Sequence, residues 1–436
     1  MPENGGDVYK AVPAVEVFAW GKRVGAVAHD PRVGYYAFEY DPLFLATGIE
    51  LAPLTMPLAQ AREPFVFPAL PELTFHRLPA MLADALPDAF GNALVDAWMS
   101  THGVEPSAIT PLDRLAYMGK RALGALEFKP ARGPNKPSTT AIELSSLVES
   151  ARQAVIGNLA TDGHASDALM QIIRVGTSAG GARAKAVIAW NPKSNEIRAG
   201  QFDVARGFEH WILKFDGLRA NQELGDPVGY GRIEYAYHLM ARRAGMVLPD
   251  ARLLEENGRA HFMTKRFDRA GNTKHHVQTL CAMAHLDYNQ KATHDANQLF
   301  LAMDRLELSY KEKEEAFRRV AFNVVAANCD DHTKNMSFLL REGARWELAP
   351  AYDVTHAHNP KGDWTNQHLM GVNGKFTRIT RADLLDLADR FGIGTAPKVL
   401  DAVIDAVAAW PDFGKAAGMD KGAIQRIETD LRSIGL

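Results

Sequence analysis

A polar segment late in the chain carries the residue types that phosphoryl transfer requires. It reads NCDDHTKN over residues 328–335, so Asn335 follows Asp330 by five positions. Transfer of a phosphoryl group from a nucleotide needs a carboxylate beside the acceptor hydroxyl and oxygen ligands for Mg²⁺. One loop can present Asp330 to the acceptor and Asn335 to the metal. A short hairpin then leads to Tyr352 and Asp353, and Asp353 is placed to be a second metal ligand.

An Asp and an Asn at this spacing, taken alone, are more often a solvated loop after a helix. The order of the features favours the chemistry instead: Asp330, Asn335, a hairpin at Glu342-Gly343, then Asp353. Protein kinases use the same offset between their catalytic Asp and their metal-binding Asn.

A Gly-rich turn earlier in the chain, TSAGGARAK over residues 177–185, is a candidate phosphate-binding loop. Gly180 and Gly181 would let backbone N–H groups approach phosphate oxygens closely. It is not a Walker A loop, because Ala182 stands where the Lys would be needed. A plain turn stays the alternative, and the position between an expected helix and an expected strand favours phosphate binding.

Lys214 lies within an apolar strand pattern, WILKF. A buried ammonium is costly unless an anion accompanies it, and kinases supply nucleotide phosphates and a Glu from the next helix. Glu234, near the start of the following helical segment, is the candidate partner. Lys214 could instead extend to water from an edge strand, and Glu234 could merely complement the helix dipole.

Composition excludes several classes of protein. The 436 residues hold 49 Lys and Arg against 52 Asp and Glu, a net charge of −3, which argues against a bulk nucleic-acid binder. The two cysteines, Cys281 and Cys329, exclude a disulfide framework. The histidine pairs at 275–276 and 356–358 lack a third metal ligand at structural-site spacing. With no signal pattern and no long apolar run, we expect a soluble cytoplasmic protein without membrane contact.

The elements that must position these residues alternate between strand and helix patterns. A hairpin is expected around residues 21–23, a broken helix over 77–99, and a second hairpin at Asn257-Gly258. Helical periodicity also covers residues 144–155, 166–173, 232–245, 292–306, 311–327, 381–391 and 397–410.

These segments together resemble the HipA family, the Ser/Thr kinase toxins of bacterial toxin–antitoxin pairs, over nearly the whole chain. VEVFAWGKRVGAVAHD, LADALPDAFGN and MGKRALGALEFKP look like the family's N-terminal module. TSAGGARAKAVI is similar to the family's Gly-rich loop, WILKF is similar to its Lys strand, and IEYAYHLMARRAGM is similar to the helix that follows. KRFDR is similar to its hinge. NCDDHTKN and PAYDV are similar to its catalytic and metal motifs.

The resemblance implies an α+β fold: a two-lobed protein/phosphoinositide-kinase-like core, with a β-containing N-terminal module and a mostly helical C-terminal lobe. The expected domains are a module over residues 1–130, a linker over 131–149, a kinase N-lobe over 150–268 and a C-lobe over 269–436. It also implies ATP and Mg²⁺ as cofactors, with Asp330 as the catalytic residue and Asn335 and Asp353 as metal ligands. The implied nucleotide contacts are Gly180, Gly181, Ala182, Arg183, Ala184, Lys185, Lys214, Lys265, Arg266, Phe267, His332, Thr333, Lys334, Asn335, Tyr352 and Asp353.

Ser178 matches the loop serine that such kinases autophosphorylate, with Thr177 as the alternative acceptor. A dianion there would repel the ATP phosphates and inactivate the enzyme. Relatives commonly have the sequence His-Gln-Glu-Asp after the hinge, whereas this chain has HVQT over residues 276–279. A Gln that contacts the nucleotide is therefore missing or shifted to Gln278. Lys265 stands where an acidic residue is common.

The resemblance further implies partners. Family members phosphorylate translation components, notably aminoacyl-tRNA synthetases, and pair with a small helix-turn-helix antitoxin (HipB-like) that contacts operator DNA, so DNA is engaged only indirectly. Two other functions stay open. One is a catalytically idle co-repressor that bridges DNA-bound antitoxins, and the other is a small-molecule or lipid kinase.

Overall fold

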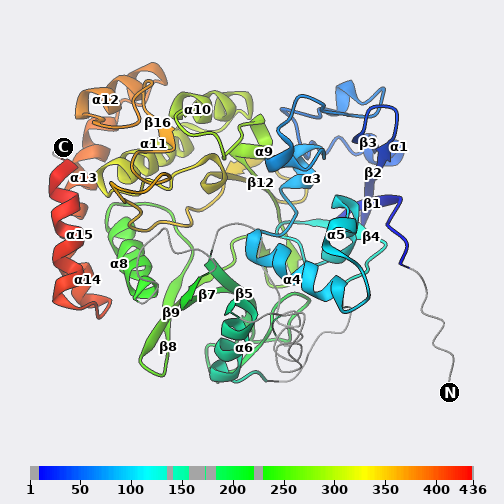
Figure 1. Ribbon diagram of the computed structural model, residues 1–436. Coiled ribbons are helices and arrows are strands. Elements are labelled where there is room, and N and C mark those ends of the chain that lie inside the picture. The colour runs from blue at the N-terminus through cyan, green and yellow to red at the C-terminus, as the bar shows by residue number, and fades with distance from the viewer. Residues whose placement is uncertain (1–8, 135–140, 157–171, 173–182, 220–228, 435–436) are drawn as a thin grey trace.

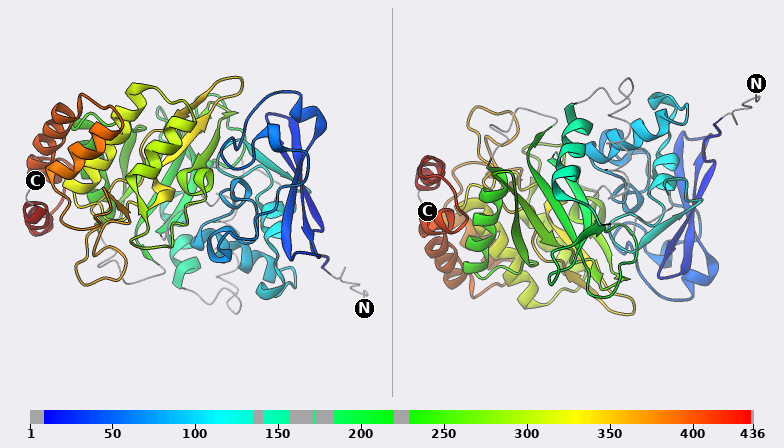
Figure 2. Two further views of the ribbon diagram at one scale, coloured as in Figure 1. Left: turned by 90° about the horizontal axis from the view of Figure 1, so that it is seen from above. Right: turned by 90° about the horizontal axis from the view of Figure 1, so that it is seen from below.

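The computed structural model describes residues 9–134, 141–156, 172, 183–219 and 229–434. Figure 1 shows three parts that meet at the centre of the molecule: an N-terminal module at the right, a sheet below, and a group of helices at the upper left. The views from above and below in Figure 2 keep the same order, with the N-terminal strands and helix α15 at opposite ends.

The N-terminal module is built on a four-stranded sheet in the order β3-β2-β1-β4. Its strands are β1 (Ala14–Ala19), β2 (Lys22–Asp30), β3 (Tyr35–Tyr40) and β4 (Leu126–Lys129). The expected hairpin is present, because Gly21 adopts a φ of +75° and turns β1 into antiparallel β2. Alternate β1 side chains face the core, so Val15, Val17 and Ala19 are fully buried.

Short helices connect β3 to β4. They are α1 (Pro42–Leu45), η1 (Leu58–Gln60), α2 (Glu72–Phe75), α3 (Ala80–Ala83), α4 (Ala89–Ser100), η2 (Pro106–Ala108) and α5 (Pro111–Met118). The broken helix expected over 77–99 is therefore two helices, since Pro87 and the N-cap residue Asp88 start α4 anew. That break brings residues 84–88 toward the centre of the molecule.

The second part is a five-stranded antiparallel sheet in the order β6-β5-β7-β9-β8. Its strands are β5 (Arg183–Trp190), β6 (Ile197–Ala199), β7 (Glu209–Arg219), β8 (Ala251–Glu256) and β9 (Arg259–Lys265), with helices α6 (Leu144–Ile156) and α8 (Tyr230–Arg243). The expected hairpin at Asn257-Gly258 joins β8 to β9. Register places Lys185 of β5 directly opposite Lys214 of β7. Both side chains therefore point to the same face of the sheet.

The third part is mostly helical. Its helices are α9 (Leu280–Ala284), α10 (Ala296–Arg305), α11 (Tyr310–Val325), η3 (Thr333–Asn335), α12 (Arg381–Arg390), α13 (Ala396–Ala408), α14 (Trp410–Ala416) and α15 (Lys421–Ile434). Its strands are β10 (Arg269–Ala270), β11 (Thr273–Lys274), β12 (His276–Thr279), β13 (His294–Asp295), β14 (Ser337–Leu340), β15 (Trp346–Leu348) and β16 (Met370–Gly371). Helix α11 lies at the centre of this part, with Phe317 and Phe322 fully buried.

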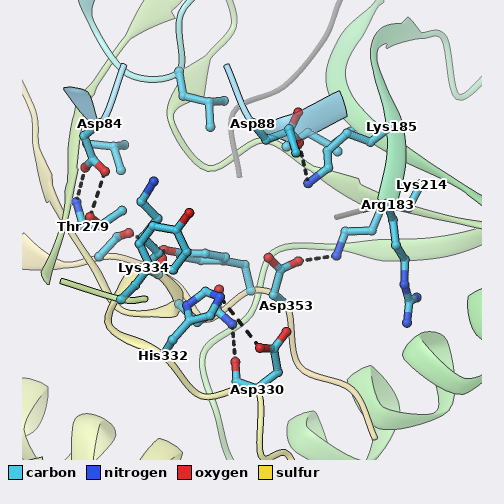
Figure 3. Close-up of a pocket in the computed structure, with 18 of the residues that line it drawn as sticks. Asp84, Asp88, Arg183, Lys185, Lys214, Thr279, Asp330, His332, Lys334 and Asp353 are labelled. Atoms are coloured by element: carbon cyan, nitrogen blue, oxygen red, sulfur yellow. Dashed lines mark hydrogen bonds and ion pairs between the residues drawn. The ribbon is translucent and has the colours of Figure 1, made fainter. Parts of the chain in front are cut away.

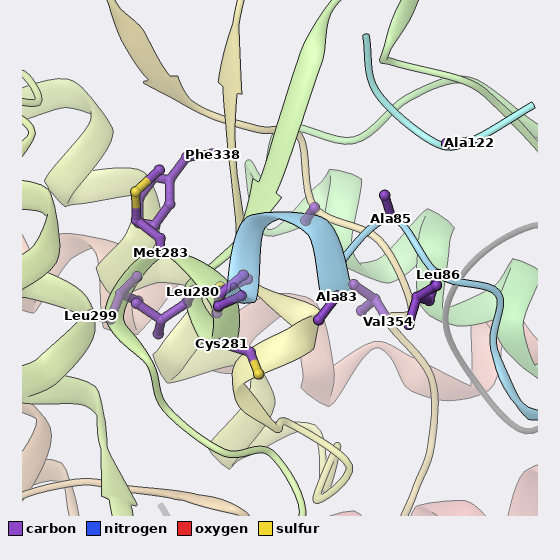
Figure 4. Close-up of a cluster of buried hydrophobic side chains, with 14 of the residues drawn as sticks. Ala83, Ala85, Leu86, Ala122, Leu280, Cys281, Met283, Leu299, Phe338 and Val354 are labelled. Carbon is purple, nitrogen blue, oxygen red and sulfur yellow. The ribbon is translucent and has the colours of Figure 1, made fainter. Parts of the chain in front are cut away.

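Apolar and polar contacts fix the N-terminal module to the other two parts. Figure 4 shows Ala83, Ala85 and Leu86 in the same buried cluster as Leu280 and other side chains of the helical part. Beside this cluster, Asp84 accepts hydrogen bonds from the backbone N–H and the hydroxyl of Thr279, at 2.7 and 2.9 Å. The segment after α3 is thus held against the helical part.

The elements agree with the α+β prediction, with local differences. The expected helix 397–410 is two helices, α13 and α14, because Pro411 lies at the start of a new helix. Helix α15 was not predicted. The expected helix over 166–173 lies outside the described residues, Ile172 excepted. Among the residues described, none belongs to a helix long and apolar enough to cross a bilayer.

Candidate active site

A cavity of about 660 Å³ lies where the three parts meet. Most of the described residues predicted as site residues line it, although they come from segments far apart in the sequence. These are Arg183, Lys185, Lys214, Glu234, Lys265, Arg266, Phe267, Asp330, His332, Lys334, Asn335, Tyr352 and Asp353. Figure 3 shows Lys214 pointing toward Asp353, with Asp330 and His332 below them and Lys185 pointing toward Asp88.

Lys214 is held between two carboxylates on the sheet side of the cavity. Its Nζ lies 2.5 Å from Oε1 of Glu234 on α8 and donates a second short hydrogen bond to Asp353. Burial alone would lower the pKa of Lys214, yet these two carboxylates outweigh it and raise that pKa above its usual value. Lys214 is therefore an ammonium at neutral pH. The possibility that it extends to water does not hold, because the side chain is only 12 % exposed.

Asp353 reaches Lys214 from an unusual backbone conformation. Its φ is +52°, in the left-handed region that non-glycine residues rarely adopt, and such residues concentrate at functional sites. Burial would raise the pKa of this carboxyl, but the neighbouring Lys214 ammonium outweighs burial and holds the pKa far below its usual range. Asp353 is thus a permanent carboxylate on the cavity wall.

Lys185, opposite Lys214 in the sheet, has a different partner. Its Nζ lies 3.3 Å from Oδ2 of Asp88, and the two side chains are 6 % and 3 % exposed. Asp88 belongs to the N-terminal module and also accepts the backbone N–H of Gly91 at the start of α4. The module therefore supplies the carboxylate partner of Lys185, a role that the sequence pattern did not predict.

The loop with Asp330 follows the end of α11. Ala327, at a φ of +51°, turns the chain out of the helix, and the side-chain amide of Asn328 donates to Asn323 at 2.9 Å. Asp330 Oδ1 accepts the indole N–H of Trp364 at 2.8 Å and lies 3.9 Å from Nε2 of His332. Burial raises the pKa of the Asp330 carboxyl. Its side chain nevertheless remains 36 % exposed to the cavity.

Asn335 and Asp353 suit the metal-binding role that the sequence predicts. The Asn335 side-chain nitrogen donates to the backbone carbonyl of Asp330 at 2.7 Å, which leaves the amide oxygen as the atom for a ligand. An amide oxygen and an ionised carboxylate are the hard oxygen donors that Mg²⁺ prefers. Among the described residues, no group of three or more His, Cys, Asp or Glu side chains could hold a metal ion.

Asp331 has a structural part in the same loop. It accepts hydrogen bonds from the backbone N–H of Leu369 at 2.7 Å and from Nδ1 of His368 at 2.8 Å. Burial would lower the pKa of His368, but the Asp331 carboxylate outweighs it and raises that pKa to about 10. The pair is a buried imidazolium and carboxylate, and it fixes the loop with Asp330 to the segment after Asp353.

The predicted hinge residues lie at one end of the cavity. The backbone N–H groups of Lys265 and Arg266 bond to the carbonyls of Asp250 and His210 at 2.8 and 2.9 Å. The Arg266 guanidinium is buried on Asp268. Phe267 stacks on Tyr352, with ring centroids 5.8 Å apart. The backbone N–H groups of Lys265 and Arg266 are therefore already paired within the protein.

Some predicted residues lie elsewhere. Ala184 and Thr333 are buried and do not line the cavity, and Thr333 donates to the carbonyl of Leu286. Gln278 is fully buried, because Val277 and Thr279 on the same strand face the cavity and Gln278 faces away. Thr177, Ser178, Gly180, Gly181 and Ala182 lie outside the described residues.

Asp84, Asp88 and Trp364 are among the cavity residues that the sequence analysis missed. The LPDAFGN motif over residues 86–92 indicated a break in a helix and a resemblance to the family's N-terminal module, and nothing in the spacing linked it to the Gly-rich region. Trp364 follows a polar stretch, NPKGD, that resembles an ordinary loop. Trp364 lies between Asp353 and the next expected helix, residues 381–391. A search of that segment for aromatic side chains could have found it.

The small antiparallel sheet, the helical part and the charged cavity between them define a kinase fold. The cavity brings together the Lys214 ammonium, the Asp330 and Asp353 carboxylates and the Asn335 amide. Phosphoryl transfer uses groups of these kinds.

Comparisons with known proteins identify the family of this chain. Residues 177–411 match the HipA-like C-terminal domain and residues 15–129 match the HipA N-terminal domain. A chain of the Shewanella oneidensis MR-1 toxin–antitoxin system HipA, HipB and operator DNA complex is similar at a TM-score of 0.64 and 16 % identity, over 96 % of each chain. The Helicobacter pylori proinflammatory kinase CtkA is 15 % identical over 59 % of this chain and 94 % of its own, at a TM-score of 0.33.

The chain belongs to the HipA family, the kinase toxins of toxin–antitoxin systems. Its kinase fold and its use of a nucleotide follow from that membership.

Proposed function

We propose that this protein is an ATP- and Mg²⁺-dependent serine/threonine protein kinase. The observation that carries the proposal is the fixed Lys214 ammonium, bonded to Glu234 and Asp353 across the cavity from Asp330. Lys214 can replace its bond to one of these carboxylates with a bond to nucleotide phosphates without leaving its position. The domain division expected from the sequence, with lobes over 150–268 and 269–436, is proposed on the same basis.

Seven of the cavity residues would have defined roles in this reaction. Asp330 would accept a hydrogen bond from the acceptor hydroxyl and orient it toward the γ-phosphorus. Lys214 and Lys185 would offset the charge on the phosphate oxygens, which matters most in the transition state. Asn335 and Asp353 would hold Mg²⁺, which supplies charge neutralisation at the phosphates when bound. Phe267 and Tyr352 would contact the adenine ring.

The proposal extends to substrate and partners through the family. Its protein substrate would be a translation component, for example an aminoacyl-tRNA synthetase, and Ser178 or Thr177 would be the site of self-phosphorylation. A small helix-turn-helix antitoxin would be the partner, as the HipB of the S. oneidensis complex is for its HipA. Operator DNA would be reached through that antitoxin.

Intact-mass analysis of phosphatase-treated protein tests the proposal. After incubation with Mg-ATP we expect a gain of one phosphate, mapped to the peptide with Thr177 and Ser178. Asp330→Asn should reduce the rate by about 10²–10⁴-fold, because the acceptor loses its oriented base. Asp389→Asn, on the exposed face of α12, is the matched control and should react normally.

Two results would support the other functions. If the wild-type protein neither turns over ATP nor gains phosphate, a catalytically idle co-repressor is the better description. If labelled phosphate appears on a metabolite and never on protein, the chain is a small-molecule kinase.

A further inference from the structure

The carboxylate of Asp330 has one neighbour that the proposed reaction does not yet use. Trp364 donates its indole N–H to Oδ1 of Asp330 at 2.8 Å and lines the same cavity. It lies in the segment between Asp353 and β16, where protein kinases have their activation loop. We propose that Trp364 is a positioning residue, which fixes the Asp330 carboxylate and forms one wall of the site for the acceptor side chain. This inference rests on the proposed kinase function.

The start of the segment that carries Trp364 is paired with the catalytic loop. The backbone N–H of Cys329 donates to the carbonyl of Ala357 at 3.1 Å, and the N–H of Ala357 donates to Ala327 at 3.2 Å. Beyond this pairing, the N–H of Asn359 bonds to the carbonyl of Thr365 at 3.1 Å and closes a compact loop. Thr365 is only 1 % exposed. The neighbour of Trp364 is thus anchored in the interior.

The end of the segment is held by the residue next to Asp330. Asp331 bonds to His368 and to the backbone N–H of Leu369, and all three groups are buried. Two consecutive carboxylates, Asp330 and Asp331, therefore hold two points of one segment. Because both ends are fixed, the indole has a defined place beside Asp330.

A lysine fixes the outer side of the loop. Lys291 donates to the backbone carbonyl of Asp363, and its Nζ lies 6.0 Å from the centroid of the Trp364 ring. That distance is at the limit for a cation–π contact. The indole N–H thus contacts the Asp330 carboxylate, and a positively charged side chain lies near the ring.

The chemistry of an indole suits orientation of Asp330 rather than competition with an acceptor. An indole N–H donates one hydrogen bond and accepts none, so it cannot take up the proton of the acceptor hydroxyl. A carboxylate offers about four lone-pair sites, and Trp364 uses one of them on Oδ1. The Asp330 side chain keeps 36 % of its surface exposed to the cavity despite this bond. Room for the acceptor hydroxyl therefore remains at the carboxylate.

Substitution of Trp364 tests the inference. Trp364→Phe keeps an aromatic wall and removes the donor, and Trp364→His restores an N–H. The rate of phosphate incorporation into the chain would be measured against ATP concentration. We expect Trp364→Phe to lower the maximal rate about tenfold, the effect of one lost orienting hydrogen bond, with the half-saturating ATP concentration changed less than twofold. Trp364→His should recover part of the maximal rate.

Trp20→Phe is the matched control. Trp20 is also partly buried, and its indole donates to a backbone carbonyl, that of Lys274, at the same 2.8 Å but outside the cavity. It should leave both kinetic parameters unchanged. If Trp364 had a purely structural role, Trp364→Phe would lower thermal stability and ATP affinity together. Trp364→His would then not selectively restore the maximal rate.

The outcomes separate the inference from the function on which it rests. A Trp364→Phe rate equal to that of an active wild-type protein overturns the positioning role and leaves the kinase assignment intact. A rate that rises would mean that the indole blocks the acceptor, which also overturns it. An inactive wild-type protein would count against both proposals.

Discussion

Lys185 and Lys214 lie directly opposite each other on neighbouring antiparallel strands, and each ammonium is compensated by a different part of the chain. Lys214 bonds to Glu234 and Asp353, which belong to the kinase lobes. Lys185 is paired with Asp88 of the N-terminal module. Like charges at a directly paired position destabilise a sheet. When no phosphate is present, the carboxylates around Lys214 and the carboxylate beside Lys185 are therefore both needed to offset the two ammonium charges. The N-terminal module is thereby part of the electrostatics of the cavity.

Asp88→Asn should strengthen nucleotide binding. Asn keeps an acceptor for the Gly91 N–H at the start of α4, while Lys185 loses its counter-charge and becomes available to phosphate. We expect the Kd for Mg-ATP, measured by calorimetry, to fall several-fold. Without nucleotide the variant should be less stable by about 3 kcal/mol, because one member of a buried ion pair is left uncompensated. Saturating Mg-ATP should recover much of this loss.

The control for that variant lies on the same helix. Asp96, also on α4, forms an ion pair of 2.6 Å with Arg114 and does not line the cavity. Asp96→Asn should leave the Kd unchanged. An equal or weaker affinity in Asp88→Asn would show that Lys185 does not reach the phosphates.

Lys214→Met should abolish phosphate transfer while it preserves the fold. Without the ammonium, the Glu234 and Asp353 carboxylates face the nucleotide phosphates with no counter-charge. We expect the maximal rate to fall by about 10²–10³-fold, the size of effect seen when one electrostatic contact to the reacting group is removed. Lys375→Met, which removes an exposed pair with Asp383, should behave as wild type in the same radiolabel assay. A Lys214→Met protein with more than a tenth of the normal rate would contradict this role.

Thr279→Val tests how the N-terminal module is attached. The Thr279 hydroxyl donates to Asp84 and accepts the N–H of Ala282 as the N-cap of α9. Its loss should lower the free energy of unfolding by about 2 kcal/mol, from a missing cap and a buried carboxylate with one partner fewer. Urea unfolding measures this. Thr293→Val, whose hydroxyl is exposed, should change stability by less than about 0.5 kcal/mol.

The sequence predicted the α+β fold and many of the cavity residues, some from local patterns and the others through the resemblance to the HipA family. Asp330 and Asn335 lie in one loop, and Lys214 and Glu234 lie in consecutive elements, so spacing along the chain indicated their roles. Asp88 and Lys185 are almost a hundred positions apart and come together only through packing of α4 beside β5. Trp364 reaches Asp330 because Asp331 holds the following segment. No local pattern encodes contacts of that kind.

His368 should make stability fall as the pH rises through the alkaline range. Its pKa is raised from 6.5 to about 10 in the folded protein, because the Asp331 carboxylate favours the imidazolium. A group whose pKa is raised by folding gives its full contribution to stability at any pH below its unfolded pKa, here 6.5. This contribution is lost as the pH rises from 6.5 to about 10. Urea unfolding at a series of pH values should therefore show a decline that is absent in His368→Gln. Tyr310→Phe, at an exposed hydroxyl that contacts Thr395, is the control and should keep the wild-type profile. If His368→Gln retains the same decline, His368 is not the group responsible, and the buried pair with Asp331 is not charged at neutral pH.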